Sequence, residues 1–361
     1  MATILHITEA LGGGIAHSVP LLMREQARAG HKLYLLYSRR DDTPAEEELD
    51  RLLPSPIRRK CIPMVRPISI LEDYAAAMLI RKELLACASD VVHLHSSKAG
   101  ALGRLAALGL GLGDRIYYSP RGLSFLNPEL GAISRSIYHF AEWTLCRLGG
   151  VLVAASESER EVLVERLGVS RVALLENAVE IDEIPVATAM PLTPGRKLNI
   201  VTVGRISEQK APWRFAKVAA SLYPKCDFSW LGEGPGRDLW LRDAPVHVSG
   251  WIPVWQVRAQ LARADIFVLL SSYEGMPISL IEAQVAGLPA VVTNVVGNRD
   301  IVIDGENGYL VESEAEAIDR IVQLIENPGL RHALGEKARV MAVKRFNADR
   351  MAAVSFRLYG F

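Results

Sequence analysis

The segment at residues 265–293 reads DIFVLLSSYEGMPISLIEAQVAGLPAVVT, and it decides the fold class. Its apolar run IFVLL is typical of a strand that is buried on both faces of a parallel sheet. Pro277 favours the start of a helix, at its first residue, and Gly287 with Pro289 favours its end. The apolar run AVVT follows. The segment therefore predicts a strand, a helix and a second parallel strand, which is the repeating unit of a doubly wound sheet.

The same alternation extends over the rest of the chain. TILHIT at residues 3–8 and NIVTVG at residues 199–204 each open a half in which strand-like runs alternate with amphipathic segments. Between the halves, prolines, a glycine and short polar residues replace this pattern, which indicates a linker. We predict an α/β fold of two Rossmann-like domains, at residues 1–180 and 199–345, with a linker at residues 181–198.

The composition excludes several classes of protein. Lys plus Arg and Asp plus Glu both number 41 among the 361 residues, so the chain lacks the broad positive field of most nucleic-acid binders. The four cysteines are scattered without a C-x-x-C pair, which indicates neither a zinc site nor a disulfide framework. The start of the chain does not resemble a signal peptide, and the most apolar window, residues 99–113, is too short to span a bilayer. We expect a cytoplasmic protein.

Two glutamates flank the predicted helix start in YEGMPISLIE. The first turn of a helix offers unpaired N–H groups, here at residues 278–280, which suit a phosphate and would leave Glu274 and Glu282 facing an anion. A nucleoside diphosphate sugar resolves this conflict, because Glu282 could accept from ribose hydroxyls and Glu274 from hydroxyls of the sugar. The alternative is structural: the helix dipole favours one glutamate and water solvates the other.

The longer segment at residues 271–311 resembles the donor-site signature of the retaining GT-B glycosyltransferases called glycosyl transferases group 1, or family four. Glu274 and Glu282 match its E-x7-E hallmark, and the glycine-rich pattern ending at Gly308 matches as well. The resemblance implies two Rossmann-like domains that face each other across a cleft, with the last helix, at about residues 346–361, crossing back to the N-terminal domain.

VGRISEQK at residues 203–210 is similar to the family element in which an arginine and a lysine bind the donor diphosphate. Arg205 and Lys210 take these places, and Ala211 stands where the family usually has glycine. A leaving diphosphate gains charge as the glycosidic bond breaks, so two fixed cations would stabilise the transition state more than the ground state. Taken alone, an arginine and a lysine in such a loop are more often solvated surface charges.

Weaker resemblances complete the predicted donor site. GEGPG at residues 232–236 and GWIP at residues 250–253 are similar to turns near the nucleotide, and the loop ALGGG at residues 10–14 would approach the ligand closely. That loop lacks G-x-G-x-x-G, which argues against a dinucleotide coenzyme. The predicted donor-binding residues are Gly13, Gly14, Gly234, Ile252, Gly275, Met276, Pro277, Ile278, Ser279, Leu280 and Glu282.

On the acceptor side, HLHSSKAG and YYSPRGL resemble loops of enzymes that build bacterial surface polysaccharides. Arg121 stands where such enzymes often have a histidine near the sugar, which leaves His95 or His93 as alternatives. A strand-end histidine is more often a packing residue. The predicted catalytic residues are Glu274, Arg205, Lys210 and His95, with Arg121 on the acceptor side.

Arg58, Arg59 and Lys60 lie between apolar residues in what we expect to be a loop, and this mixture suits a protein on an anionic membrane. An ordinary solvated loop has the same composition. Any membrane association would be peripheral, on the inner face of the cell membrane.

These observations predict a retaining hexosyltransferase that uses a nucleoside diphosphate sugar, UDP rather than GDP, and a saccharide acceptor on a lipid carrier. No D-x-D triplet occurs, so we expect no metal at the diphosphate and no cofactor. One alternative is a nucleotide-sugar 2-epimerase of similar fold, which would need no acceptor. Another is a non-catalytic partner protein that binds the nucleotide sugar.

Overall fold

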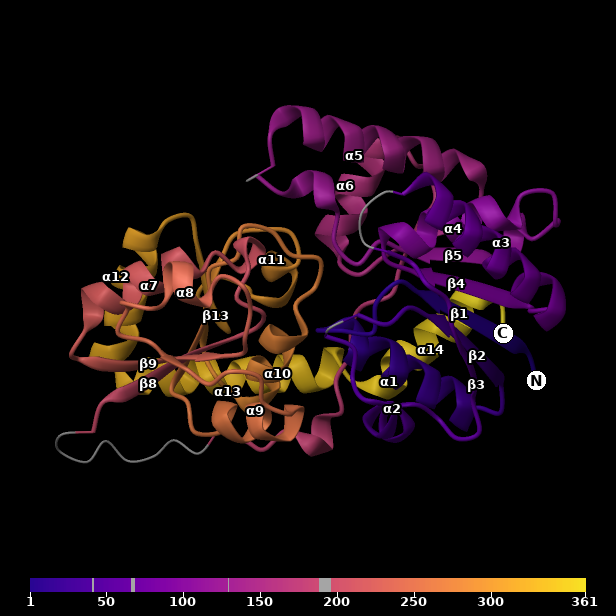
Figure 1. Cartoon of the computed structure of the whole chain (residues 1–361). Coiled ribbons are helices and arrows are strands. Elements are labelled where there is room, and N and C mark those ends of the chain that lie inside the picture. The colour runs from indigo at the N-terminus through magenta and orange to yellow at the C-terminus, as the bar shows by residue number, and fades with distance from the viewer. Residues whose placement is uncertain (41, 66–68, 129, 188–195) are drawn as a thin grey trace. The chain divides into compact units, whose positions relative to one another are not determined.

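The computed structural model describes residues 1–361 apart from 41, 66–68, 129 and 188–195 (Figure 1). The chain divides into two compact units. Unit 1 consists of Met1–Leu126, Leu130–Ala178 and Ala348–Phe361, and unit 2 is built on Val179–Asn347. Part of the predicted linker, at residues 188–195, lies outside the described residues.

Unit 1 contains a sheet of seven parallel strands in the order β3-β2-β1-β4-β5-β6-β7. The strands are β1 (Thr3–Thr8), β2 (Lys32–Tyr37), β3 (Arg58–Cys61), β4 (Val91–His95), β5 (Ile116–Ser119), β6 (Val151–Ala154) and β7 (Val172–Leu174). Successive side chains of a strand point to opposite faces, so Leu5 and Ile7 belong to one apolar core and Ile4 to another.

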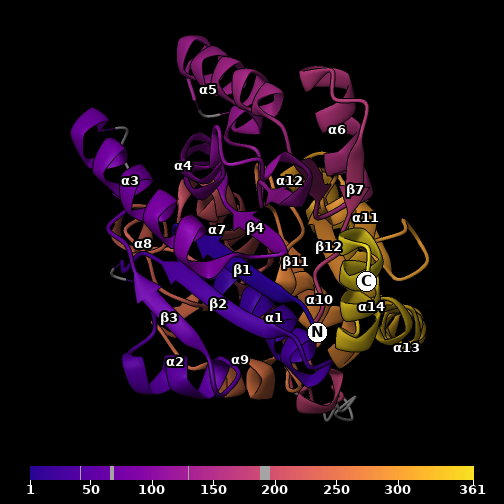
Figure 2. The ribbon, with the colours of Figure 1, turned by 90° about the vertical axis from the view of Figure 1, so that its right-hand side faces the viewer.

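Helices cover both faces of this sheet. They are α1 (Ile15–Arg28), α2 (Glu46–Leu52), α3 (Ile70–Cys87), α4 (Ser97–Ala107), α5 (Ala132–Leu145), α6 (Glu157–Leu167) and α14 (Ala348–Tyr359). The core on one face takes residues from α3, α4 and α6, and the other core takes residues from α1, α2 and α14. Figure 2 shows α3 and α4 above β1 and β2, with α1 and α2 below them. The place of α14 in unit 1 fits the predicted return of the last helix.

Unit 2 contains a sheet of six parallel strands in the order β10-β9-β8-β11-β12-β13. The strands are β8 (Leu198–Val203), β9 (Cys226–Leu231), β10 (His247–Val248), β11 (Ile266–Leu269), β12 (Ala290–Thr293) and β13 (Gly308–Val311). The helices are α7 (Pro212–Leu222), α8 (Arg237–Trp240), α9 (Val254–Leu261), α10 (Ile278–Ala286), α11 (Asn298–Ile301), α12 (Glu314–Glu326) and α13 (Pro328–Arg345). Two doubly wound parallel sheets confirm the predicted α/β fold class.

The deciding segment forms β11, α10 and β12, and β11 pairs with β12 in parallel. One detail of the prediction was wrong. Pro277 is the residue before the helix, with an extended backbone (φ −72°, ψ 118°), and α10 begins at Ile278. Gly287 ends the helix with φ +86°, a left-handed conformation that glycine adopts without strain.

Candidate active site

The loops that follow β8 and β11 meet at the carboxyl end of the unit 2 sheet, where doubly wound sheets bind ligands. Lys210 Nζ donates to Glu274 Oε1 at 2.6 Å, and both side chains are largely buried. The Ser272 N–H donates to the Gln209 carbonyl at 2.9 Å, which ties the two loops together. The Gln209 side chain adds a bond to the Tyr273 carbonyl at 3.2 Å. The predicted catalytic carboxylate is therefore held in contact with one predicted diphosphate cation.

This ion pair balances charges that neither loop could bury alone. A buried carboxylate without a counter-ion costs several kcal/mol, and its removal from water is tolerated only when a cation and hydrogen bonds replace the water. Arg205, the second predicted cation, lies in the same loop as Lys210 and has an exposed side chain. The loop thus presents one lysine that positions Glu274 and one arginine that faces solvent.

Glycine at position 297 lets a third loop, which follows β12, approach the turn that carries Glu274. A Cβ at Gly297 would lie 2.3 Å from the Gly275 carbonyl oxygen, and its φ is +83°. Gly234 has a similar structural reason, because a Cβ there would lie 2.3 Å from the Ile206 carbonyl oxygen. The predicted donor role of Gly234 is therefore not needed to explain the glycine.

Replacing Gly297 by alanine is expected to lower the free energy of unfolding by about 2–4 kcal/mol, because the new methyl group meets backbone at a left-handed φ. Gly305 is the matched control, since its φ is +73° and a methyl group there would have nothing within 4 Å. Its alanine variant should lose only about 1 kcal/mol. Urea unfolding measures both values. Equal losses in the two variants would contradict the close packing of the loop against Gly275.

The first turn of α10 carries the predicted phosphate-binding N–H groups. Helix geometry leaves the N–H groups of residues 278–280 without an intrahelical acceptor. The side chains of Met276, Ile278 and Leu280 are buried, so these residues can offer a ligand little beyond their backbone. Ser279 is half-buried and has a hydroxyl to offer. The helix N-terminus therefore contributes backbone dipoles and one side chain.

Glu282 lies in the second turn of α10 and is buried beside an arginine that the sequence reading did not single out. Arg258 of α9 donates through Nε to Glu282 Oε1 at 3.0 Å and also pairs with Glu183. Burial raises the pKa of Glu282 above its ordinary value, although Arg258 acts in the opposite direction. Ile252, a predicted donor-binding residue, lies in the loop that leads into α9. One oxygen of Glu282 is thus engaged by Arg258.

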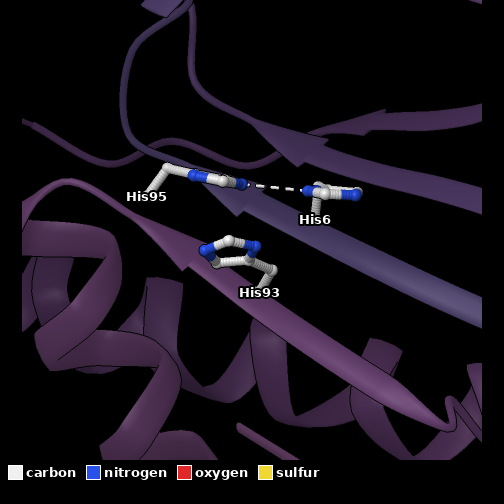
Figure 3. Close-up of side chains that lie close together, drawn as sticks. All are labelled: His6, His93 and His95. Carbon is white, nitrogen blue, oxygen red and sulfur yellow. Dashed lines mark hydrogen bonds between the residues drawn. The ribbon is translucent and has the colours of Figure 1, made fainter. Parts of the chain in front are cut away.

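In unit 1, His95 takes part in a buried chain of hydrogen bonds (Figure 3). His95 Nδ1 lies 3.3 Å from Arg121 Nη2, and His95 Nε2 lies 2.9 Å from His6 Nδ1. His6 Nε2 lies 2.8 Å from Gln26 Oε1. A guanidinium can only donate, so Arg121 requires an unprotonated His95 Nδ1, and each ring then donates to the next acceptor. The chain runs in one direction, from Arg121 to Gln26.

Arg121 and His93 extend this network. Arg121 Nη1 donates to Ser18 Oγ at 3.0 Å and to Asn177 Oδ1 at 2.6 Å. His93 lies 2.6 Å from the Tyr359 hydroxyl of α14 and 2.9 Å from Ser119 Oγ. His93 and His95 are both fully buried. The structure therefore brings both acceptor-side histidines and Arg121 together as interior groups, and every ring nitrogen of the two histidines bonds to protein.

Ring nitrogens of His6, His93 and His95 lie within 4.8 Å of one another, close enough to hold a metal ion together. Each nitrogen of these rings already has a protein partner, and the cationic Arg121 lies beside His95. A cation would have to break these bonds and approach a guanidinium. The residues fit a neutral hydrogen-bond network better than a metal centre.

The network makes the fold acid-sensitive. Burial lowers the pKa of His6 to about 4, helped by Arg121 and opposed by Gln26, and burial likewise lowers the pKa of His93 and His95 well below the usual range. In the unfolded chain a histidine has a pKa of about 6.5. Between about pH 6.5 and about pH 4 the unfolded state therefore binds more protons than the folded state. Stability is lost as the pH falls through this window, on the order of 3 kcal/mol for His6.

The residues predicted to meet a membrane form a strand, β3, and the expected loop is therefore wrong. Arg59 pairs with Glu46 and with Asp50, each at 2.7 Å, and Lys60 pairs with Glu83 at 2.5 Å. Arg58 lies over the Tyr34 ring at 5.9 Å. Three acidic partners leave little net positive charge for anionic lipid, so membrane contact at β3 stays an untested prediction.

Family models match both units. The model of "Glycosyltransferase Family 4" matches residues 12–183, and the model of "Glycosyl transferases group 1" matches residues 189–341. The chain is a glycosyltransferase with a family 4 domain and a group 1 domain. The second match includes Arg205, Lys210, Glu274 and Glu282, and the family resemblance predicted from the sequence is confirmed.

Relatives with assigned activities agree with this membership. The chain is 27% identical over 305 residues to the UDP-Gal:alpha-D-GlcNAc-diphosphoundecaprenol alpha-1,3-galactosyltransferase of Escherichia coli, covering 79% of this chain and 78% of the relative. It is 31% identical over 164 residues to the lipopolysaccharide core biosynthesis glycosyltransferase LpsE of Rhizobium meliloti, covering 44% and 48%. Both relatives are glycosyltransferases, in agreement with the family models.

Solved structures share the fold. Sucrose-phosphate synthase of Thermosynechococcus elongatus matches with a TM-score of 0.83 at 17% identity, over 99% of this chain and 98% of that one. HepE of Anabaena, solved in complex with UDP and glucose, matches with a TM-score of 0.81 at 16% identity over 100% of both chains. These likenesses confirm the two-domain, Rossmann-like GT-B class. Among the described residues, none of the helices has the length and apolar character to cross a bilayer.

Proposed function

We propose that this glycosyltransferase moves a hexose from a UDP sugar to a saccharide on a lipid diphosphate carrier, with retention of the anomeric configuration and without a metal. The buried ion pair of Lys210 with Glu274, beside the start of α10, carries the proposal. A carboxylate that can accept hydrogen bonds from sugar hydroxyls, a fixed cation and the first N–H groups of α10 thus lie at the same edge of the unit 2 sheet. The activity of the Escherichia coli relative supports the UDP sugar and the lipid-linked acceptor.

In this proposal different residues of unit 2 bind different parts of the donor. Arg205, Lys210 and the first N–H groups of α10 bind the diphosphate, and Glu282 accepts from the ribose. Glu274 accepts from hydroxyls of the transferred sugar. Negative charge grows on the diphosphate as the bond from C1 to the phosphate oxygen breaks, and the two cations take the part that a metal plays in other transferases.

The acceptor hydroxyl attacks C1 from the face that the diphosphate leaves. A new bond forms from C1 to the acceptor oxygen, and the acceptor proton passes to a phosphate oxygen of the departing UDP. No protein base is required, which agrees with the buried, fully bonded state of His95. We assign Arg121 a structural role, in which its hydrogen bonds hold the acceptor side of unit 1 in its conformation.

A lipid-linked acceptor implies work at a membrane surface, on the cytoplasmic face where UDP sugars are made available. The donor would be bound by unit 2 and the acceptor by unit 1. This location is part of the proposal.

The test is a transfer assay with a diphosphoundecaprenyl-linked saccharide and with a soluble short-chain analogue, in EDTA, against a set of UDP and GDP sugars. We expect transfer from one UDP sugar and an α-configured product, detected by proton NMR. A β-configured product would contradict retention, and activity that appears only with added divalent metal would contradict the metal-free site. Conversion of the donor sugar without acceptor would favour the epimerase alternative.

A further inference from the structure

Arg258 of α9 is a cation that turns inward. Its side chain is 7% exposed, and it shares the buried side of the helix with Leu261, three residues further on. This helix packs on α10, which carries Glu282. Burial of a guanidinium costs free energy unless carboxylates and hydrogen bonds replace its water. The inward position of Arg258 therefore depends on its partners.

The guanidinium of Arg258 joins two carboxylates. Its Nε donates to Glu282 Oε1 at 3.0 Å, and its Nη1 donates to Glu183 Oε2. Glu183 lies in the short 3-10 helix η4 (Ile181–Glu183), and its side chain is 57% exposed, whereas that of Glu282 is 8% exposed. A planar guanidinium holds its N–H groups in fixed directions. The bond to Glu183 thus fixes the direction in which Arg258 meets Glu282.

Glu282 keeps its second oxygen for another partner. In the part of the chain that the structure describes, Arg258 is the one group that donates to this carboxylate, and it does so at Oε1. A buried carboxylate oxygen ordinarily accepts hydrogen bonds. Glu282 lies one turn beyond Ile278, so its Cα is about 6 Å along the axis from the helix start. A ligand bound by its phosphates at the helix start can bring hydroxyls to Oε2.

We propose that Arg258 is a positioning residue for donor binding, which holds Glu282 so that Oε2 accepts from the ribose hydroxyls of the nucleotide. The inference rests on the proposed function, because it takes Glu282 as the residue that binds the ribose. It adds a substrate class, since a buried acceptor built for a hydroxyl rejects an analogue without it. The site then selects nucleoside diphosphates of ribose over those that lack the 2′ and 3′ hydroxyls.

Stability alone gives little reason for this buried ion pair. The neighbours of Glu282 on α10 are apolar and buried, among them Leu280, Ile281 and Val285, and an apolar pair in place of a buried ion pair is often as stable. Burial raises the pKa of Glu282, and Arg258 opposes this rise. The arginine therefore favours an ionised carboxyl, which accepts hydrogen bonds and donates none.

The experiment measures, by calorimetry in EDTA, the dissociation constants of UDP and 2′,3′-dideoxy-UDP with the full chain. The same pair of guanosine diphosphates is measured alongside, so that the hydroxyl preference is obtained on whichever base the site binds. We expect the unchanged protein to prefer the ribose form by about tenfold or more. In Arg258→Met this preference should fall to about threefold or less, while the affinity for the dideoxy form stays within about twofold.

Three further variants separate positioning from a merely structural role. Arg258→Lys keeps the charge but not the planar fork, so an intermediate preference is expected. Adding Arg258→Met to Glu282→Ala should change the preference no further, because the arginine acts through that carboxylate. The exposed Arg263, just beyond α9, supplies the control Arg263→Met, which should retain the full preference.

Two results would overturn the proposal. One is a hydroxyl preference that Arg258→Met leaves unchanged, whether or not both nucleotides bind more weakly. The other is a further fall in preference when Arg258→Met is added to Glu282→Ala. If Arg258→Met does not fold, Arg258→Lys decides in its place, and an unchanged preference in that variant has the same consequence.

The transfer assay separates this proposal from the proposed function. If the unchanged protein transfers sugar and binds UDP but shows no hydroxyl preference, only the positioning role fails. If binding shows the expected preference and its loss in Arg258→Met, but no acceptor receives sugar, the proposed transfer fails and the positioning role holds. A folded protein that binds no nucleoside diphosphate would contradict both.

Discussion

Replacing Glu274 by glutamine is expected to lower kcat by about a thousandfold while the dissociation constant of the donor changes by less than about threefold. The amide keeps a hydrogen-bond acceptor for Lys210, so the loops stay joined, but it lacks the charge that holds the sugar hydroxyls in the transition state. Lys210 is then left with more of its charge for the diphosphate, which protects binding. Single-turnover kinetics and calorimetry measure the two quantities separately.

The control for this variant is Glu314→Gln. Glu314 pairs with Arg214 at 3.5 Å and with Lys217 at 3.8 Å on the surface of unit 2, so its replacement should leave both quantities unchanged. A Glu274 variant that loses donor affinity in proportion to kcat would assign Glu274 to binding alone and would sink its proposed role.

Replacing Lys210 by methionine is expected to lower kcat/KM by about a thousandfold and to weaken donor binding by about tenfold or more. Two effects combine in this variant, because the diphosphate loses a cation and the buried Glu274 loses its counter-ion. The thermal midpoint should also fall. Lys210→Arg tests the geometry, since a guanidinium keeps the charge but not the compact ammonium.

The contact between Lys210 and Glu274 has a further consequence. Loss of donor binding in Lys210→Met should be absent from Glu274→Gln, and the double variant should bind donor better than Lys210→Met alone, because it no longer buries an unpaired carboxylate. Additive losses of donor affinity in the double variant would mean that the two side chains act independently and that the ion pair does not contribute to donor binding.

Acid unfolding offers a separate check of unit 1. His6→Gln should lose part of the stability difference between about pH 7 and about pH 4.5, because the variant removes one group whose pKa is lowered by burial. Urea unfolding at the two pH values gives the difference, and the exposed His247 supplies the control variant His247→Gln. Identical pH dependence in His6→Gln and the unchanged protein would contradict a neutral, buried His6.

The fold could be predicted because its signals are local. The apolar runs, the proline before α10 and the glycine after it all act within a few residues, and they indicate the order of strands and helices in both units. The same reasoning placed Pro277 one residue too far into the helix, since it fits either the first helical residue or the one before it.

The contacts of the site could not be predicted in the same way. The sequence pointed to Lys210 and Glu274 separately, but they are 64 residues apart and only the neighbouring places of β8 and β11 bring them together. Arg258 reads as one of several charges on an amphipathic helix, and its burial against Glu282 depends on how α9 packs. The spacing of residues along α9 does not show which of its charged side chains turns inward.

In unit 1 the sequence pointed to His95, His93 and Arg121, and missed His6. His6 lies in the middle of β1, 89 residues before His95, and nothing in TILHIT indicates that this histidine belongs to a hydrogen-bond network. The basic run at Arg58 illustrates the converse, because its acidic partners come from α2, which precedes the run, and from α3, which follows it. Charge patterns alone do not show which charges are already paired.

The most direct test of the donor site is a thermal-shift measurement of the purified protein with UDP, GDP and ADP and their sugar conjugates in EDTA, with Glu282→Ala beside it. A ligand that binds only the folded state raises the melting temperature. At a concentration one hundred times its dissociation constant it adds about 2.7 kcal/mol to the free energy of unfolding. We predict a shift with UDP and its conjugates that is strongly reduced in Glu282→Ala. A folded protein that shows no shift with any nucleoside diphosphate, or an equal shift in Glu282→Ala, would contradict the proposed donor site.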